Sequence, residues 1–214
     1  MNAMFKSSKK YMPTYILIAL NMIFYVYTSI IGGDFITIGD RAILLFGQVN
    51  YYVIYCGWYW QLFTAMFVHV SITHLLGNMF FLLVFGLRAE EMFNIQEYLL
   101  IYFLSGFTGN LLSLAFGPYS APGVPFVSAG ASGAIFGMFG ACVIYVRRAI
   151  GQSIISALLY SFFLLMISMG LNVNVLAHLG GLVVGLLIGY ALAATRKFKV
   201  THTYEYRYSF PTGR

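Results

Sequence analysis

The sequence predicts an all-α membrane protein, a bundle of six helices that each cross the bilayer. Hydrophobic residues make up 60% of the 214 residues and charged residues only 8%, whereas soluble domains carry about 25% charged residues. The mean hydropathy of +0.82 agrees with a membrane protein. Membrane-spanning strands would show short segments of alternating hydrophobicity, and this chain shows long apolar stretches. We therefore expect a polytopic helical bundle.

Six stretches are long and apolar enough to cross a hydrocarbon layer of about 30 Å, which takes about 20 helical residues. In chain order they are about 11–31, 68–87, 96–116, 131–148, 151–170 and 175–194. The first is too long for a removable signal peptide and lacks a small-residue cleavage site, so we expect it to remain as the first helix. Between the third and fourth, residues 118–125 contain three prolines, which excludes a helix there.

Positive charge predicts the orientation of the bundle. Eleven of the twelve Lys and Arg residues lie on one side of the predicted bundle: Lys6, Lys9, Lys10, Arg88, Arg147, Arg148, Arg196, Lys197, Lys199, Arg207 and Arg214. Only Arg41 lies on the other side. Cytoplasmic segments carry an excess of Lys and Arg, so we expect both termini in the cytoplasm. Membrane orientation thus accounts for the net charge of +6, and no nucleic-acid partner is expected because no basic soluble face is evident.

One domain is expected, because no polar linker or internal repeat divides the chain. Residues 1–200 form the predicted membrane domain, and residues 201–214 a cytoplasmic tail. The longest predicted connection, about 32–61, lies outside and ends in aromatic residues: Tyr51, Tyr52, Tyr55, Trp58, Tyr59 and Trp60. Such residues gather at the headgroup layer. We expect them to form an aromatic belt rather than to take part in chemistry.

Ser132 is the candidate nucleophile. It lies in Gly130-Ala131-Ser132-Gly133, where the fourth predicted helix begins. Unpaired backbone N–H groups and the positive end of the helix dipole favour a developing anion at such a position. The alternative is that Ser132 only caps the helix, a common role for serine.

His178 is the candidate base, and its predicted depth matches that of Ser132. From Ser132 to Arg147 is fifteen residues, and from His178 to Arg196 is eighteen, or roughly 22 Å and 27 Å of helix. Tilt absorbs a difference of one turn. Gly133 and Gly137 on the fourth helix, and Gly181 and Gly185 on the sixth, form small-xxx-small surfaces that allow close packing. An unpaired histidine inside a membrane is costly, so we expect the two side chains to meet.

A third polar cluster, His69, His74 and Asn78, lies in the second predicted helix. The spacing of the two histidines does not match helical zinc sites, and no Cys or carboxylate lies near them in the sequence. We expect no metal. Because His74 and Asn78 are four residues apart and share a helix face, they are candidates for stabilising an oxyanion together with the Ser132 N–H.

The acidic residues do not complete a triad. None of the six lies within a predicted span at the level of Ser132: Asp34, Asp40, Glu90, Glu91, Glu97 and Glu205. We therefore expect a dyad of Ser132 and His178. Phe136, one turn after Ser132, is expected to stack on the imidazole; the alternative is that it is only one of the 20 phenylalanines that pack the bundle.

Taken together, these residues resemble the rhomboid family of intramembrane serine proteases over most of the chain. The matching pieces are Trp60-Gln61-Leu62-Phe63-Thr64, the segment from His69 through His74 to Asn78, Glu90, the segment Gly130 to Gly137, and Ala177-His178-Leu179-Gly180-Gly181 with Gly185. The resemblance implies Ser132 as nucleophile and His178 as base and then acid. It implies an oxyanion hole of the Ser132 N–H, His74 and Asn78, supported by His69.

The resemblance also implies structural roles for Trp60 and Glu90. The chain departs from the family pattern at Gln61, where an arginine is frequent, and at Phe136, where a tyrosine is frequent. The first departure puts the anchoring of the outer loop in doubt, and the second removes a hydroxyl but keeps the ring.

By the same resemblance, the expected substrates are membrane-anchored proteins, cleaved within or near the bilayer without a cofactor. The alternative is a catalytically inactive rhomboid-like protein that binds or escorts membrane proteins, although inactive relatives usually lack the serine or histidine. A transporter is disfavoured because the chain shows no repeated halves. A prokaryotic inner membrane is the expected location, and the sequence does not indicate an oligomeric state.

Overall fold

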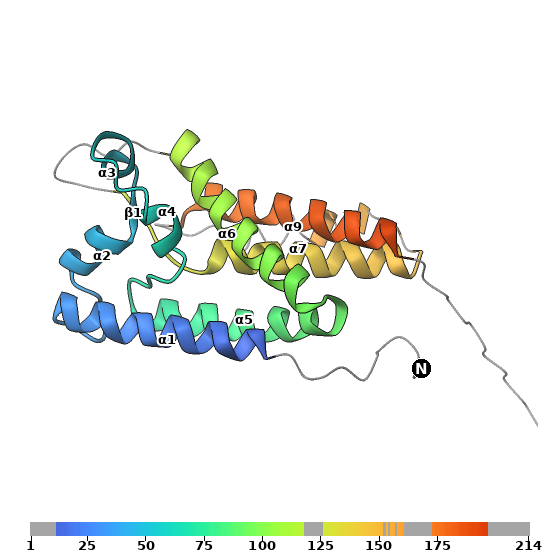
Figure 1. Cartoon of the computed structure of the whole chain (residues 1–214), viewed down its shortest axis with the longest axis horizontal. Helices are drawn as coiled ribbons and strands as arrows, with labels where there is room; N and C mark the ends of the chain where they lie inside the picture. The colour runs from blue at the N-terminus through green and yellow to red at the C-terminus, as the bar shows by residue number, and fades with distance from the viewer. Residues whose placement is uncertain are drawn as a thin grey trace, which may run out of the picture.

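In the computed structural model of the protein, the residues that are described form a bundle of five long helices, whose arrangement Figure 1 shows. They are α1 (Pro13–Gly32), α5 (Ile72–Met92), α6 (Ile95–Phe116), α7 (Ser132–Ala149) and α9 (Val175–Thr195). The structure describes residues 12–117, 126–151, 153, 155, 156, 158–160 and 173–196. Most of the fifth predicted stretch, the proline-rich residues 118–125, the N-terminal residues 1–11 and the tail 201–214 lie outside that range.

Four of these helices, α1, α5, α6 and α9, are long and apolar enough to cross a membrane. The helix α7 has 18 residues, many of them Gly and Ala, and packs against α5, α6 and α9. Two thirds of its residues are buried within the protein, so it has less need of the large apolar side chains that face lipid. This central position explains why α7 is less hydrophobic than its neighbours.

The limits of α5 differ from the sequence prediction of 68–87. The helix begins at Ile72 because Ser71 caps it, accepting a hydrogen bond from the His74 N–H at 3.2 Å. Residues just before the cap pair with the segment after α1, where the Ile38 N–H donates to the Val70 carbonyl at 3.0 Å. At the other end, α5 continues to Met92, so Arg88 and Glu90 lie in its last turns rather than after it. Charged side chains can extend out of the apolar layer from a backbone that is still helical.

The connection between α1 and α5 contains four short elements that the sequence analysis did not predict. These are α2 (Asp40–Phe46), β1 (Gln48–Val49), α3 (Asn50–Tyr55) and α4 (Gln61–Thr64). They gather at one end of the bundle (Figure 1), which we call the loop end. The strand β1 pairs antiparallel with β2 (Val127–Ser128), and Gln48 lies opposite Ser128. The aromatic residues of this segment include exposed Tyr55, Tyr59 and Trp60.

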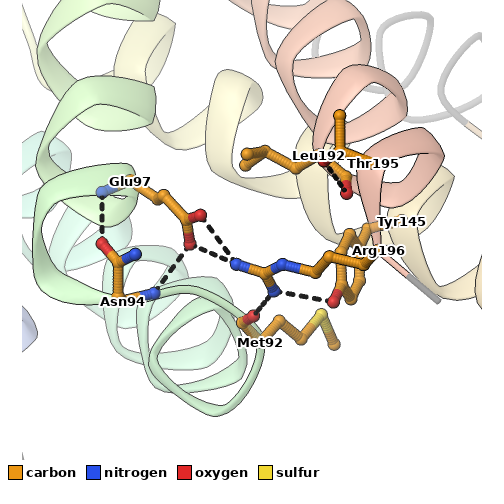
Figure 2. Close-up of polar contacts among 7 residues, drawn as sticks. All are labelled: Met92, Asn94, Glu97, Tyr145, Leu192, Thr195 and Arg196. Carbon is orange, nitrogen blue, oxygen red and sulfur yellow. Dashed lines mark hydrogen bonds and ion pairs between the residues drawn. The ribbon is translucent and has the colours of Figure 1, made fainter. Parts of the chain in front are cut away.

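A polar cluster ties α9 to the α5–α6 connection at the opposite end of the bundle (Figure 2). Arg196 donates to both carboxylate oxygens of Glu97 at 2.7 and 2.5 Å, and to the Met92 carbonyl and the Tyr145 hydroxyl at 2.7 Å each. Glu97 also closes a capping box with Asn94 at the start of α6. Burial alone would lower the pKa of Arg196, but the hydrogen bonds to Glu97 and Tyr145 outweigh it and raise that pKa.

Glycines bring α7 and α9 into backbone contact. A Cβ atom on Gly181 would overlap the carbonyl oxygen of Gly133, and one on Gly185 would overlap that of Gly137. A Cβ atom on Gly137 would overlap the side chain of Ser105 on α6. The three helices α6, α7 and α9 therefore meet along surfaces that only glycine allows.

We predict that Gly181→Ala lowers the free energy of unfolding by about 1–3 kcal/mol, because the added methyl group forces the packed helices apart. The matched control is Gly77→Ala on α5, where nothing lies within 4 Å of the new Cβ atom and alanine is favoured over glycine in a helix. Thermal unfolding in detergent micelles measures both. Equal stability of the two variants would contradict the tight packing described here.

A second prediction concerns the Arg196 cluster. Arg196→Ala removes hydrogen bonds between a partly buried guanidinium and a carboxylate, which should lower the free energy of unfolding by about 2 kcal/mol. In a chain of this size, that loss lowers Tm by about 4–8 °C. The control is Arg88→Ala, whose ion pair with Glu91 is exposed and should contribute little. Similar Tm values for the two variants would show that the cluster does not hold α9.

Candidate functional site

Ser132 and His178 lie within hydrogen-bonding distance of each other. Ser132 is the first residue of α7, and His178 lies in the first turn of α9. The Ser132 Oγ and the His178 Nε2 are 2.8 Å apart, although 46 residues separate them in the chain. His178 is 7% exposed. The structure thus brings together the two residues that the sequence analysis singled out.

Phe136 stacks on the imidazole ring of His178. The ring centroids are 4.4 Å apart, and the ring planes are inclined by 19°. Phe136 lies one turn after Ser132 on α7, so the same helix supplies the hydroxyl and the ring that faces the imidazole. A phenylalanine is sufficient for this contact because it is made through the ring face.

His74 and Asn78 lie on α5 and face the loop that leads to Ser132. Gly130 in that loop has a φ of +123°, and a Cβ atom there would lie 2.9 Å from the His74 Cε1. Only glycine combines that backbone conformation with so close an approach. The Asn78 Nδ2 donates to the His74 carbonyl at 2.9 Å, which leaves its second N–H for another acceptor.

His69 lies behind His74 and is fully buried. Its Nδ1 lies 3.2 Å from the Phe67 carbonyl, and its ring meets the ring of His74 edge to face at 5.2 Å. Its contact with the site is therefore through His74. In the part of the chain that the structure describes, no three His, Cys, Asp or Glu side chains gather closely enough to hold a metal ion.

A cavity of about 550 Å³ connects these groups. Ser132, His178, His74 and Asn78 all line it, as does Phe136. Its wall on the α5 side includes Phe81 and Phe85, and its lining also contains Gly77, Gly106, Asn110, Ser128, Gly130 and Asn174. No Asp or Glu is among the described residues that line it. The hydroxyl and the imidazole therefore share a cavity that contains polar groups but no carboxylate.

Gln61 and Trp60 hold the short elements of the loop end together. Gln61 is fully buried, accepts a hydrogen bond from the Val49 N–H at 2.9 Å and donates to the Leu44 carbonyl at 2.7 Å. The Trp60 indole N–H donates to the Leu45 carbonyl at 3.1 Å. The amide of Gln61, where the family pattern frequently has an arginine, thus links α4 to β1 and α2 within the loop end.

Glu90 is a structural residue at the other end of α5. Its carboxylate accepts a hydrogen bond from the Thr14 N–H at 2.9 Å. This contact holds the first turn of α1 against the last turns of α5. Glu90 does not line the cavity.

The sequence analysis missed a set of polar residues beside the cavity, buried apart from the half-buried Asn174, which we call the amide frame. Its members are Gln48, Asn50, Asn110, Ser113, Ser128 and Asn174. They join β1, α3, α6, β2 and the start of α9 through side-chain hydrogen bonds. The available signal was the presence of Asn and Gln at the ends of apolar stretches, where an unpaired amide would be costly.

Comparisons with known proteins show that the chain is similar to rhomboid proteins. A model of the rhomboid domain matches residues 56–195. Rhomboid protease GluP of Bacillus subtilis is 35% identical over 84% of this chain and 34% of its own length. The putative rhomboid protease YdcA of the same organism is 37% identical over 63% of this chain and 67% of its own length.

A plant protein, RHOMBOID-like protein 6, mitochondrial, of Arabidopsis thaliana, is 38% identical over 62% of this chain. The match covers 43% of that protein, so the chain spans less than half the length of the plant protein and of GluP. The domain match itself covers more than half of this chain and contains Ser132, His178, His74 and Asn78. By this match, the chain belongs to the rhomboid family.

Proposed function

We propose that the protein is an intramembrane serine protease that cleaves membrane-anchored proteins with a dyad of Ser132 and His178. Rhomboid proteins are typically intramembrane serine proteases, and two of the relatives above are named as proteases or putative proteases. The observation that carries the proposal is the 2.8 Å distance between the Ser132 Oγ and the His178 Nε2. A hydroxyl and an imidazole at this distance are arranged for nucleophilic catalysis.

In this mechanism, the Ser132 Oγ attacks the carbonyl carbon of the scissile peptide bond while the His178 Nε2 accepts its proton. The protonated imidazole then donates that proton to the leaving nitrogen, and an acyl-enzyme remains on Ser132. A water molecule, deprotonated by His178, hydrolyses the ester and restores the serine. Stacking on Phe136 keeps the imidazole facing Ser132 through both proton transfers.

The developing oxyanion is stabilised by the start of α7 and by α5. Ser132 is the first residue of α7, where backbone N–H groups have no intrahelical partner. His74 and Asn78 line the same cavity and add side-chain donors on its α5 side. Donors that are already in place lower the barrier because they need no rearrangement during the reaction.

The substrates in this proposal are transmembrane segments that reach the cavity from the bilayer. A segment must unwind before attack, because a hydrogen-bonded helix hides its carbonyl groups. We therefore expect substrates with easily unwound helices and, by the resemblance to rhomboid relatives, small side chains before the scissile bond. The apolar helices and the family make the chain an integral membrane protein, and we propose six spans with both termini on the cytoplasmic side of a prokaryotic inner membrane.

Ser132→Ala should abolish cleavage of a reporter membrane protein in liposomes, because no other group replaces the nucleophile. A fluorophosphonate probe should label the unmodified protein at Ser132, and mass spectrometry of peptides locates the label. The control is Ser153→Ala at an exposed serine after α7, which should leave cleavage and labelling unchanged. Unchanged cleavage by Ser132→Ala would refute the proposal. Absence of cleavage by the unmodified protein, with retained binding of membrane proteins, would favour the inactive escort function.

Asn78→Ala should slow turnover by about a hundredfold or less, since loss of one oxyanion donor costs roughly 3 kcal/mol of barrier. The matched control is Asn21→Ala on α1. Asn21 donates to the carbonyl four residues before it, as Asn78 does, but does not line the cavity. Rates are compared per mole of folded protein. If Asn78→Ala were as inactive as Ser132→Ala while folded, or if both asparagine variants lost activity equally, Asn78 would not be an oxyanion donor.

A further inference from the structure

We propose that Asn174 is a positioning residue that fixes His178 relative to Ser132, an inference that rests on the proposed protease function. Asn174 precedes α9 and lines the cavity. Its side chain contacts three elements at once, and the sequence pattern gave it no role.

The side-chain amide of Asn174 uses both of its functional atoms. The Nδ2 group donates to the Ser113 Oγ at 2.7 Å and to the Ser128 Oγ at 2.6 Å. The Oδ1 accepts a hydrogen bond from the Ala177 N–H at 3.1 Å and so caps α9. The backbone carbonyl of Asn174 accepts from the His178 N–H at 3.2 Å.

These contacts join the chain segments that lead to the two proposed catalytic residues. Ser128 lies on β2, four residues before Ser132, and Asn174 lies four residues before His178. The Asn174–Ser128 hydrogen bond therefore links the approach to the nucleophile with the approach to the base. The Ser113 hydroxyl connects the same amide to the last turn of α6. The carbonyl of Ser113 accepts a second hydrogen bond, from the Asn50 side chain of the loop end, at 2.9 Å.

A dyad needs such a link more than a triad does. No carboxylate among the described residues lines the cavity, and both the stacking with Phe136 and the position of the first turn of α9 act on the direction of the imidazole. A displacement of about 1 Å between reacting groups can reduce a rate by about a hundredfold. The amide frame limits such a displacement at the point where α9 begins.

The chemistry of the position separates this role from a simple helix cap. A cap requires only an oxygen acceptor, and serine supplies one as well as asparagine does. The bridge to Ser113 and Ser128 requires two donors on a longer, planar side chain. Asn174→Ser therefore keeps the cap and removes the bridge.

The experiment compares Asn174→Ser, Ser128→Ala and the double variant in liposomes. Cleavage of the reporter substrate gives kcat and KM for each variant. Reaction with a small fluorophosphonate gives the rate at which Ser132 is labelled. We expect Asn174→Ser to lower kcat and the labelling rate together by about 10- to 100-fold, with KM within about twofold. The double variant should lose little more than Asn174→Ser alone, because both changes break the same hydrogen bond. The matched control, Asn94→Ser, changes the capping asparagine of α6 at the opposite end of the bundle and should leave kcat unchanged.

Three results would overturn the inference while leaving the proposed function intact. The first is a kcat for Asn174→Ser equal to that of the unmodified protein. The second is a loss of activity that follows a loss of folded protein in the melting curve, which would make Asn174 structural only. The third is a rise in KM with constant kcat, which would assign Asn174 to substrate binding. Failure of the unmodified protein to cleave the reporter or to be labelled at Ser132 would instead overturn the proposed function, and this inference with it.

Discussion

The close approach of α7 and α9 is the constraint on which the rest of the structure depends. The methylene groups of Gly181 and Gly185 face the carbonyl oxygens of Gly133 and Gly137 with no room for a side chain. Because Ser132 is the first residue of α7 and His178 lies in the first turn of α9, the backbone contact just beyond them sets the distance between hydroxyl and imidazole. Lipid provides no hydrophobic force that drives helices together, so small residues that allow close packing supply the attraction.

Polar groups within an apolar bundle impose the second constraint, because each must find its partner inside the protein. In the amide frame at the loop end, the side-chain N–H groups of Gln48, Asn50 and Asn110 donate to backbone carbonyls or to one another. These bonds join the short elements to the long helices. The Asn174 carbonyl, which accepts from the His178 N–H, joins the amide frame to the hydrogen bond between His178 and Ser132.

Hydropathy alone predicted the positions of α1, α6, α7 and α9 to within about two residues, because crossing an apolar layer requires a long apolar run. It misplaced both ends of α5, where a serine cap and charged last turns decide the limits. It could not predict α2, α3 and α4, since each is too short to show a helical period. Ser132 and His178 were evident because they are isolated polar groups, whereas Asn174 was not, because its partners Ser113 and Ser128 are distant in sequence.

The helix α9 is held at three levels, and all three bear on the position of His178. Asn174 fixes its first turn, glycines fix its middle against α7, and Arg196 fixes its end through Glu97. A side-chain tip about 6 Å from a helix axis moves by about 1 Å when the helix turns by about 10°. Contacts at a single level would permit such a turn, whereas contacts at both ends and in the middle oppose it. The position of His178 therefore depends on contacts along the whole length of the helix that carries it.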